Sequence, residues 1–159
     1  EIFSDAVSAK GLAMTVPELG ESYTLGEAKL EFIGPLEEYD NLNDDSLVMR
    51  LEYGDTSFLF TGDMTSKAER DLLEDGANVK CDVLKVAHHG SKYSSSEDFL
   101  AKASPETAVI SVSADDTALP DYYITALLNS VCKNVYRTDS DKTVMITVEN
   151  GEICTKTHA

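Results

Sequence analysis

The segment DVLKVAHHGS, residues 82–91, decides how this sequence folds. Its first six residues form a nearly continuous apolar run, which is typical of a strand that is covered on both faces of a sheet. The run stops abruptly at HHGS, and three serines at residues 94–96 then predict the start of a helix that reaches about residue 103. The segment therefore predicts a buried strand, a sharp loop and a helix.

A second segment, TSFLFTGD at residues 56–63, has the same character. It follows an alternating strand at residues 46–53 across a Gly-Asp turn, so the two strands are expected to form a hairpin. In open α/β sheets, functional groups gather beyond the carboxyl ends of strands. If the two apolar strands are neighbours, Asp63 converges with His88 and His89 on one edge.

The remaining patterns predict short strands, and two further helices. One helix begins at a capping box made by Ser66 and Glu69 and stops at Gly76, and the other covers residues 122–131. The strands are expected at residues 12–16, 28–33, 107–112, 134–137, 143–148 and 152–155. This order predicts one α/β (α+β) domain over residues 1–159, with a mixed sheet and helices on its outer faces.

Composition excludes several classes of protein. The chain is 42% hydrophobic, as globular proteins are, and has no apolar run near the ~20 residues that a membrane-spanning helix needs. A net charge of −16 disfavours nucleic-acid binding without excluding it, because phosphate backbones are bound by clustered cations. The three cysteines contain no CxxC pair, and each is expected to be a buried apolar side chain. Neither charge nor cysteine content fixes the cellular compartment.

From the residues alone, the candidate site has two interpretations. An Asp with one or two His is a ligand set suited to zinc, manganese or iron. Equally, an Asp after a strand is commonly a turn former, a His pair in a loop is commonly solvated, and Ser91 with the following serines is commonly a set of caps. Both interpretations stay open at this point.

Several segments together resemble a known family. In order and spacing, residues 41–54 (NLNDDSLVMRLEYG), 58–63 (FLFTGD), 82–91 (DVLKVAHHGS), 94–100 (SSSEDFL), 105–112 (PETAVISV) and 135–139 (VYRTD) resemble the later part of a metallo-β-lactamase-fold hydrolase domain. The resemblance is to the competence-type (ComEC-like) branch and covers roughly residues 10–155. It implies a partial αββα sandwich with a two-metal site on the edge of the sheet.

The resemblance also implies roles for individual residues. Asp63 is expected to bridge two metal ions and His89 to be a ligand, with His88 a catalytic or substrate-contacting partner and Ser91 a substrate contact. The implied metal is zinc, with manganese as an alternative. The implied reaction is hydrolysis of a phosphodiester or phosphoester, on a small molecule or a larger substrate, in an extracytoplasmic location.

Two departures from the family pattern limit this expectation. The chain has no HxHxDH motif upstream of the TGD segment, and Leu119 stands where the family usually has a His before Pro120, with Asp115 and Asp116 as candidate substitutes. We therefore expect this chain to require the N-terminal half of the domain as a partner, and alone to be inactive and to bind metal weakly. The alternative is a catalytically degenerate module with a binding or structural role. A third hypothesis is an acidic surface that binds a cationic partner.

Overall fold

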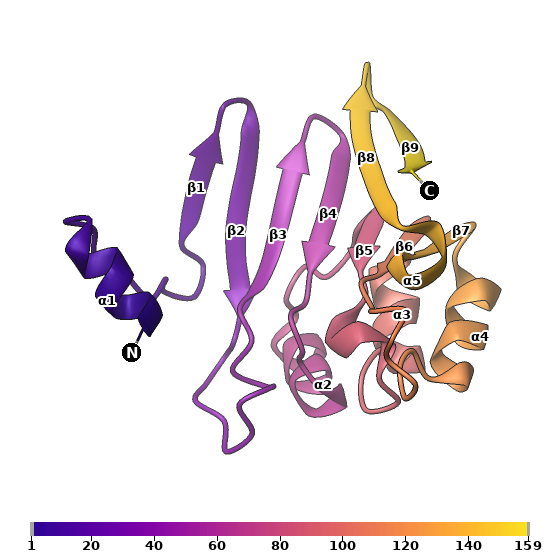
Figure 1. Cartoon of the computed structure of the whole chain (residues 1–159), viewed down its shortest axis with the longest axis horizontal. Helices are drawn as coiled ribbons and strands as arrows, with labels where there is room; N and C mark the ends of the chain where they lie inside the picture. Colours follow the sequence, from indigo (N-terminus) through magenta and orange to yellow (C-terminus); the bar gives the residue numbers. More distant parts are fainter. Residues whose placement is uncertain (1, 159) are drawn as a thin grey trace.

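The structure, a computed structural model, describes residues 2–158 and is built on a seven-stranded mixed sheet (Figure 1). The strands follow the chain order from edge to edge. The first four pair antiparallel and the last four pair parallel. The strands are β1 (Ser22–Leu25), β2 (Ala28–Gly34), β3 (Val48–Tyr53), β4 (Thr56–Phe60), β5 (Val83–Lys85), β6 (Thr107–Ile110) and β7 (Asn134–Arg137).

Three helices pack on one face of this sheet, over its parallel half. They are α2 (Ser66–Asp75), α3 (Glu97–Ala103) and α4 (Tyr122–Val131). A further helix, α1 (Ile2–Ala9), lies beyond the β1 edge and away from these three (Figure 1). The short helix η1 (Ala87–Gly90) follows β5, and α5 (Thr138–Asp141) leads into a separate antiparallel hairpin of β8 (Thr143–Glu149) and β9 (Glu152–His158).

The core lies between the helices and the parallel strands. Alternate strand residues such as Leu59, Leu84 and Ile110 are fully buried there and pack with Leu72 and Phe99 of the helices. Because side chains alternate across a strand, the core side chains of each strand are spaced two apart. Each such side chain contributes roughly 1.5–3 kcal/mol to folding, so this layer fixes the positions of the strand ends.

The opposite face of the sheet is apolar but incompletely covered. It carries the residues that alternate with the core, among them Leu51, Phe58 and Phe60. Strand β8 lies over the parallel half of this face, where Val144 and Phe60 line a common cavity. Towards the β1 edge the same face is exposed, with Tyr23 43% and Leu25 58% accessible. Apolar side chains therefore remain accessible on this face towards the β1 edge.

The predicted fold class is confirmed, as is the hairpin of β3 and β4, and some local predictions are wrong. Residues 12–16 form no strand, and β1 and α1 were not predicted. The N-cap of α2 is Thr65 rather than Ser66, because the Thr65 hydroxyl accepts from Lys67 N, while Glu69 turns towards another part of the chain.

The cysteine prediction holds for two of the three residues. Cys81 and Cys132 are buried, and burial raises their thiol pKa to about 12 and about 11 respectively. Cys154 is exposed, which corrects the expectation that all three are buried. It lies on β9, in a two-stranded hairpin that leaves one side to solvent. The buried pair therefore behaves as apolar packing, and Cys154 is the accessible thiol of the described residues.

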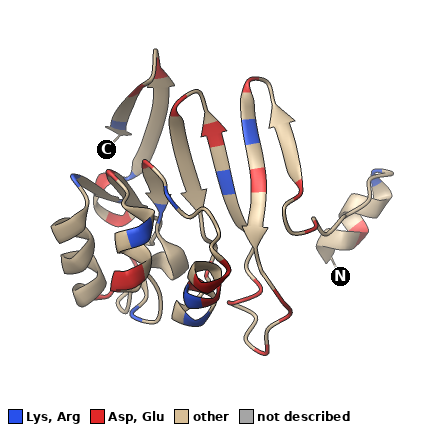
Figure 2. Cartoon of the chain, turned by 180° about the vertical axis from the view of Figure 1, so that it is seen from behind, with Lys and Arg blue, Asp and Glu red and all other residues tan. Residues whose placement is uncertain are grey.

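Acidic side chains outnumber basic ones. Asp and Glu residues lie along strands, helices and loops, with fewer Lys and Arg between them (Figure 2).

Among residues 2–158, no helix has the length and apolar character needed to cross a membrane.

Candidate metal centre

The two segments singled out from the sequence meet at one edge of the sheet. Strands β4 and β5 are parallel neighbours, so the residues that follow them leave the sheet side by side. His88 N donates to Gly62 O at 3.0 Å, and the Thr61 hydroxyl donates to Lys85 O at 2.8 Å. These two bonds tie the TGD loop to the HHG loop, and the predicted convergence of the loops is present.

Asp63 and His89 face each other across this junction. Asp63 Oδ1 lies 3.6 Å from His89 Nε2, and the two side chains are 44% and 47% exposed. The other ring nitrogen of His89 lies 2.6 Å from Ser111 O at the end of β6. A carbonyl oxygen only accepts, so Nδ1 carries the proton and, in the neutral ring, Nε2 presents a lone pair towards Asp63.

The distance between these atoms fits a shared metal ion. At 3.6 Å the pair is longer than a hydrogen bond, which has a heavy-atom separation of about 2.7–3.2 Å. Two ligands on a tetrahedral zinc, each about 2.0–2.2 Å from the ion, lie roughly 3.4 Å apart. A metal-ligating His also characteristically donates its second N–H to a carbonyl or carboxylate, as His89 does to Ser111. Asp63 and His89 are therefore suitable metal ligands.

Backbone geometry around Asp63 depends on glycine and on Ser46. Gly62 has φ +53°, and a Cβ added there would lie 2.6 Å from the Ser46 Cβ. The Ser46 hydroxyl accepts a hydrogen bond from Asp63 N at 2.9 Å. Because Gly62 has no Cβ, Ser46 can lie close enough to accept the hydrogen bond from Asp63 N, and this bond orients the Asp63 backbone.

Both histidines of the loop have left-handed backbone conformations. His88 has φ 49° and His89 has φ 55°, which few residues other than glycine adopt. Such a conformation costs about 1–3 kcal/mol per residue and is found disproportionately at functional sites. His88 Nδ1 is buried and has no hydrogen-bond partner among residues 2–158. The loop is thus held in a strained shape that aims His89 at Asp63 and directs a polar atom of His88 into the interior.

The serines after this loop have structural contacts. Ser91 is 6% exposed and its hydroxyl accepts from Tyr93 N at 3.4 Å, while Ser96 is the N-cap of α3, as predicted. The role of Ser91 as a substrate contact stays a prediction. Ser94 donates to Met64 O at 2.7 Å, which links this segment to the residue that follows Asp63.

A buried carboxylate joins the same two segments. Glu69 of α2 is fully buried, and its two carboxylate oxygens accept from Ser95 N and from Ser96 N, the latter at 2.9 Å. Burial raises the pKa of Glu69, because loss of hydration outweighs the hydrogen bonds from Ser96 and Ser95. Ser95 itself has φ 61°. Glu69 therefore holds the start of α3 against α2, directly behind the site.

The segment that contains Leu119 lies against the HHG loop. A Cβ added at Gly90 would lie 2.7 Å from the Pro120 Cβ, and Asp121 N donates to Gly90 O at 2.9 Å. Leu119 is half-buried and packs against the hydrophobic core. Asp116 uses its carboxylate to accept from the backbone N–H groups of Ala118 and Leu119, as a turn former does, and Asp115 is exposed.

The number of ligands falls short of a complete centre. In the part of the chain that the structure describes, no three His, Cys, Asp or Glu side chains are grouped so as to hold a metal ion. A catalytic zinc takes about three protein ligands and a water. Asp63 and His89 are therefore fewer than the protein ligands that such a centre takes.

Sequence reasoning missed three contributors to this edge. The acceptor for His89 is the backbone carbonyl of Ser111, and the acceptor for Asp63 N is Ser46, 17 residues away in the chain. No pattern in the sequence predicts either of these two contacts. Lys85, by contrast, could have been noticed in the sequence, since it is a charged residue inside an apolar strand. Burial lowers its pKa, and the charge of Asp63 opposes that shift.

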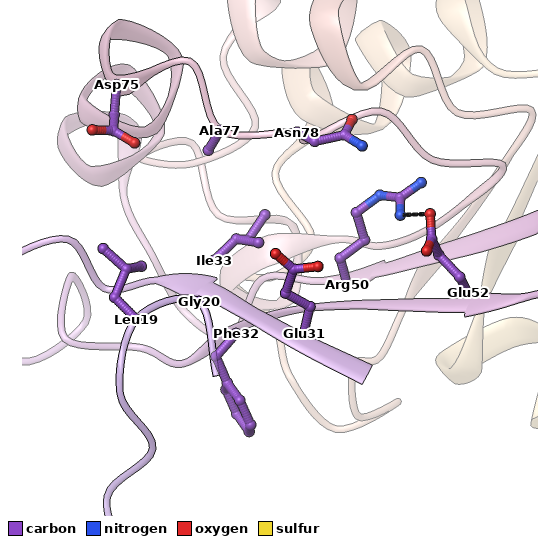
Figure 3. A pocket seen from close by; sticks show the side chains of 10 residues that line it. All are labelled: Leu19, Gly20, Glu31, Phe32, Ile33, Arg50, Glu52, Asp75, Ala77 and Asn78. Carbon is purple, nitrogen blue, oxygen red and sulfur yellow. Dashed lines mark hydrogen bonds and ion pairs between the residues drawn. The ribbon is translucent and has the colours of Figure 1, made fainter. Parts of the chain in front are cut away.

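A separate cleft of about 310 Å³ lies on the helix side of β2 and β3, at the C-terminal end of α2 (Figure 3). Arg50 pairs there with Glu52 and donates to Lys80 O, while Glu31 and Asp75 add negative charge. The lining includes neither Asp63 nor His89, so this cleft is distinct from the candidate metal centre.

Sequence comparison with known proteins identifies relatives of this chain. The sequence profile of the metallo-beta-lactamase superfamily matches residues 5–114, which include the TGD and HHGS segments. The chain is 31% identical over 147 residues to ComE operon protein 3 of Bacillus subtilis, covering 91% of this chain and 19% of that protein.

Two further relatives match shorter segments. Competence protein ComA of Neisseria gonorrhoeae is 43% identical over 84 residues, covering 51% of this chain and 12% of that protein. Recombination protein 2 of Haemophilus influenzae is 42% identical over 69 residues, covering 43% of this chain and 8% of that protein. The chain thus spans a fifth or less of the length of these relatives.

Proposed function

The chain belongs to the metallo-beta-lactamase superfamily, and from this premise we propose that it forms part of a metal-dependent hydrolase acting on phosphodiesters or phosphoesters. The single observation that carries the proposal is the pair of Asp63 Oδ1 and His89 Nε2, 3.6 Å apart, with His89 Nδ1 bound to Ser111 O. This is the spacing and the tautomer that a shared divalent ion requires.

The residues of this chain have distinct tasks in the proposed site. Asp63 and His89 bind the metal, which is zinc or, as the alternative, manganese. When bound, it supplies an activated water and stabilises the negative charge that develops in hydrolysis. Ser111 fixes the ring orientation of His89, Ser46 fixes the backbone of Asp63, and His88 is the substrate-side or supporting partner. Ser91, which follows the HHG loop, is the proposed substrate contact.

The remaining ligands would come from a covering segment on the open sheet face. The apolar face that carries Leu51, Phe58 and Phe60 leads directly to the edge with Asp63. A second half of the domain placed on this face would bury it and bring further ligands to that edge. On this proposal, residues 1–159 without such a half bind metal weakly and do not catalyse hydrolysis.

The printed names of the relatives favour one substrate class. One relative is named a competence protein and another a recombination protein, and both names point to DNA. We therefore include the DNA phosphodiester among the proposed substrates and propose an extracytoplasmic position, although a net charge of −16 does not itself attract DNA. The positive potential would have to come from the site.

Metal analysis and a hydrolysis assay of the full-length gene product test this proposal. We expect near-stoichiometric zinc or manganese and hydrolysis of bis(p-nitrophenyl) phosphate, both lost in Asp63→Asn. The matched control is Asp55→Asn, which removes the same charge from an exposed turn at the other end of β4. A wild-type protein without metal, or an Asp63→Asn variant with normal metal content, would refute the metal site.

A degenerate module that has kept the fold and lost the activity is the second candidate. Leu119 favours it, because an apolar side chain that packs against the core stands where the family usually has a His. The two candidates differ in metal content. Near-stoichiometric metal that disappears in Asp63→Asn excludes the degenerate module, while its absence from wild type combined with gain of metal in Leu119→His supports it.

A further inference from the structure

One lysine side chain, that of Lys85, projects from the sheet face opposite the helices, beside the candidate metal centre. Lys85 is the last residue of β5, in register with Phe60 of β4 and Val109 of β6. Because Leu84 points into the helix-side core, the Lys85 side chain projects from the opposite face. There it is the one charged side chain lining a cavity of about 230 Å³, whose other walls are apolar residues of β4, β5, β6 and β8.

The ammonium group of Lys85 is held towards the end of β5. Nζ donates to Val86 O at 2.8 Å, the one hydrogen bond that the described chain gives it. An ammonium has three donors, so two N–H groups stay available to a ligand. Burial lowers the pKa of Lys85, and the nearby negative charge of Asp63 opposes that shift. The cation thus lies between the apolar cavity and the edge that carries Asp63 and His89.

We propose that Lys85 binds the anionic group of the substrate, contacting a phosphoester oxygen beside the metal held by Asp63 and His89. The inference rests on the proposed function and names the chemistry of its substrate: an anion rather than a neutral ester or amide. Charge arithmetic supports this assignment. Lys85 offsets the carboxylate charge of Asp63, so this pair presents no net negative charge to an anion within a protein of net charge −16.

Partial burial makes this cation more effective than an exposed lysine. Its surroundings are apolar side chains, and electrostatic attraction is stronger where water is excluded. Lys92, the nearest cation along the loop, is exposed and lies over the Tyr93 ring, 5.2 Å from its centroid. An exposed lysine of that kind contributes little, because solvent and salt screen it.

The test measures inorganic phosphate binding by the zinc-loaded full-length gene product with isothermal calorimetry, together with zinc content. The variants are Lys85→Met, Lys85→Gln and Lys85→Arg, and Lys102→Met on α3 is the charge-matched control. Loss of one charge-assisted contact weakens phosphate binding about 10- to 100-fold in Lys85→Met and Lys85→Gln, at unchanged zinc content. Lys85→Arg retains most of the affinity, and Lys102→Met resembles wild type.

Each other outcome has a defined meaning. Wild-type phosphate affinity in both uncharged variants overturns the inference. Loss of zinc together with phosphate also overturns it, because Lys85 would then act by positioning Asp63 rather than by contacting the anion. If wild type binds zinc but no phosphate, the anion site alone fails. If wild type binds no metal, the proposed function fails. Circular dichroism checks folding, and Lys85→Gln retains a donor for Val86 O should Lys85→Met not fold.

Discussion

Replacing Glu69 with alanine tests whether one buried carboxylate holds the two site loops together. Glu69 comes from α2, which begins shortly after Asp63, and it accepts from Ser95 N and Ser96 N, which follow the HHG loop. Removal of the carboxylate therefore unlinks the segments on either side of the candidate centre. Ser95, at φ 61°, would lose the contact that holds its left-handed backbone.

The magnitude follows from the groups left without partners. A buried donor deprived of its acceptor costs about 1–3 kcal/mol, so two backbone N–H groups cost roughly 2–6 kcal/mol. Relief of the unfavourable burial of the carboxylate offsets part of this cost. We expect Glu69→Ala to lower the free energy of unfolding by roughly 2–4 kcal/mol, and the melting temperature of a chain of this size by roughly 4–16 °C.

The pH dependence of the unfolding free energy gives a second, independent test of the role of Glu69. Because burial raises the folded-state pKa of Glu69 above 4.5, its stabilising contribution is fully present below pH 4.5. That contribution is lost as pH rises through the folded-state pKa. Glu69→Gln cannot ionise, and it keeps one acceptor oxygen. The stability difference between wild type and Glu69→Gln is therefore expected to be largest below pH 4.5 and to narrow above it.

Urea unfolding of the 159-residue chain, followed by circular dichroism between pH 4 and pH 8, measures both effects. Glu74→Ala is the control, because Glu74 lies on the same helix with an exposed side chain. The reasoning is refuted if Glu69→Ala is as stable as Glu74→Ala. It is also refuted if the difference between wild type and Glu69→Gln widens as pH rises above 4.5.

Two further predictions concern backbone geometry and thiol exposure. Gly62→Ala adds a clash with Ser46 to an unfavourable φ of +53°, whereas Gly54→Ala, at φ +58°, meets nothing within 4 Å. Thermal unfolding should show Gly62→Ala as the less stable by about 1–3 kcal/mol, and equal stabilities would contradict the close approach. Ellman's reagent should modify only Cys154 in the native chain and all three thiols in urea, since the other two are buried. Rapid native modification of a second thiol would contradict this burial.

The sequence predicts the site edge well because its signals there are local and mutually consistent. Two apolar strands, each followed by a glycine-containing loop, require only parallel pairing to bring Asp63 near His89, and β4 and β5 pair in this way. The serine run begins α3 as predicted, with Ser96 as the cap. In both cases a backbone requirement, a sharp turn or an unsatisfied N–H, selects a recognisable residue type.

The errors arise where long-range packing overrides local pattern. Glu69 has the spacing of a capping box, but its carboxylate reaches Ser95 and Ser96 instead, which no local pattern specifies. Residues 12–16 have strand-forming composition but pair with no neighbour. The exposed β1, with the sequence SYTL, lies at a sheet edge, and its alternation of polar and apolar residues covers only four positions, too few to predict a strand.

The open sheet face and the incomplete ligand set have a common physical consequence under the proposed function. The face carrying Phe58, Phe60 and Lys85 ends at the edge where Asp63 and His89 supply two ligands. A segment that covers this face buries apolar area at about 25 cal/mol per Å² and supplies the missing ligands at the same time. Metal binding and docking of that segment are then linked equilibria, so each strengthens the other by the same free energy. The strained histidine loop is consistent with this coupling, because its aim at Asp63 is in place before the other ligands arrive.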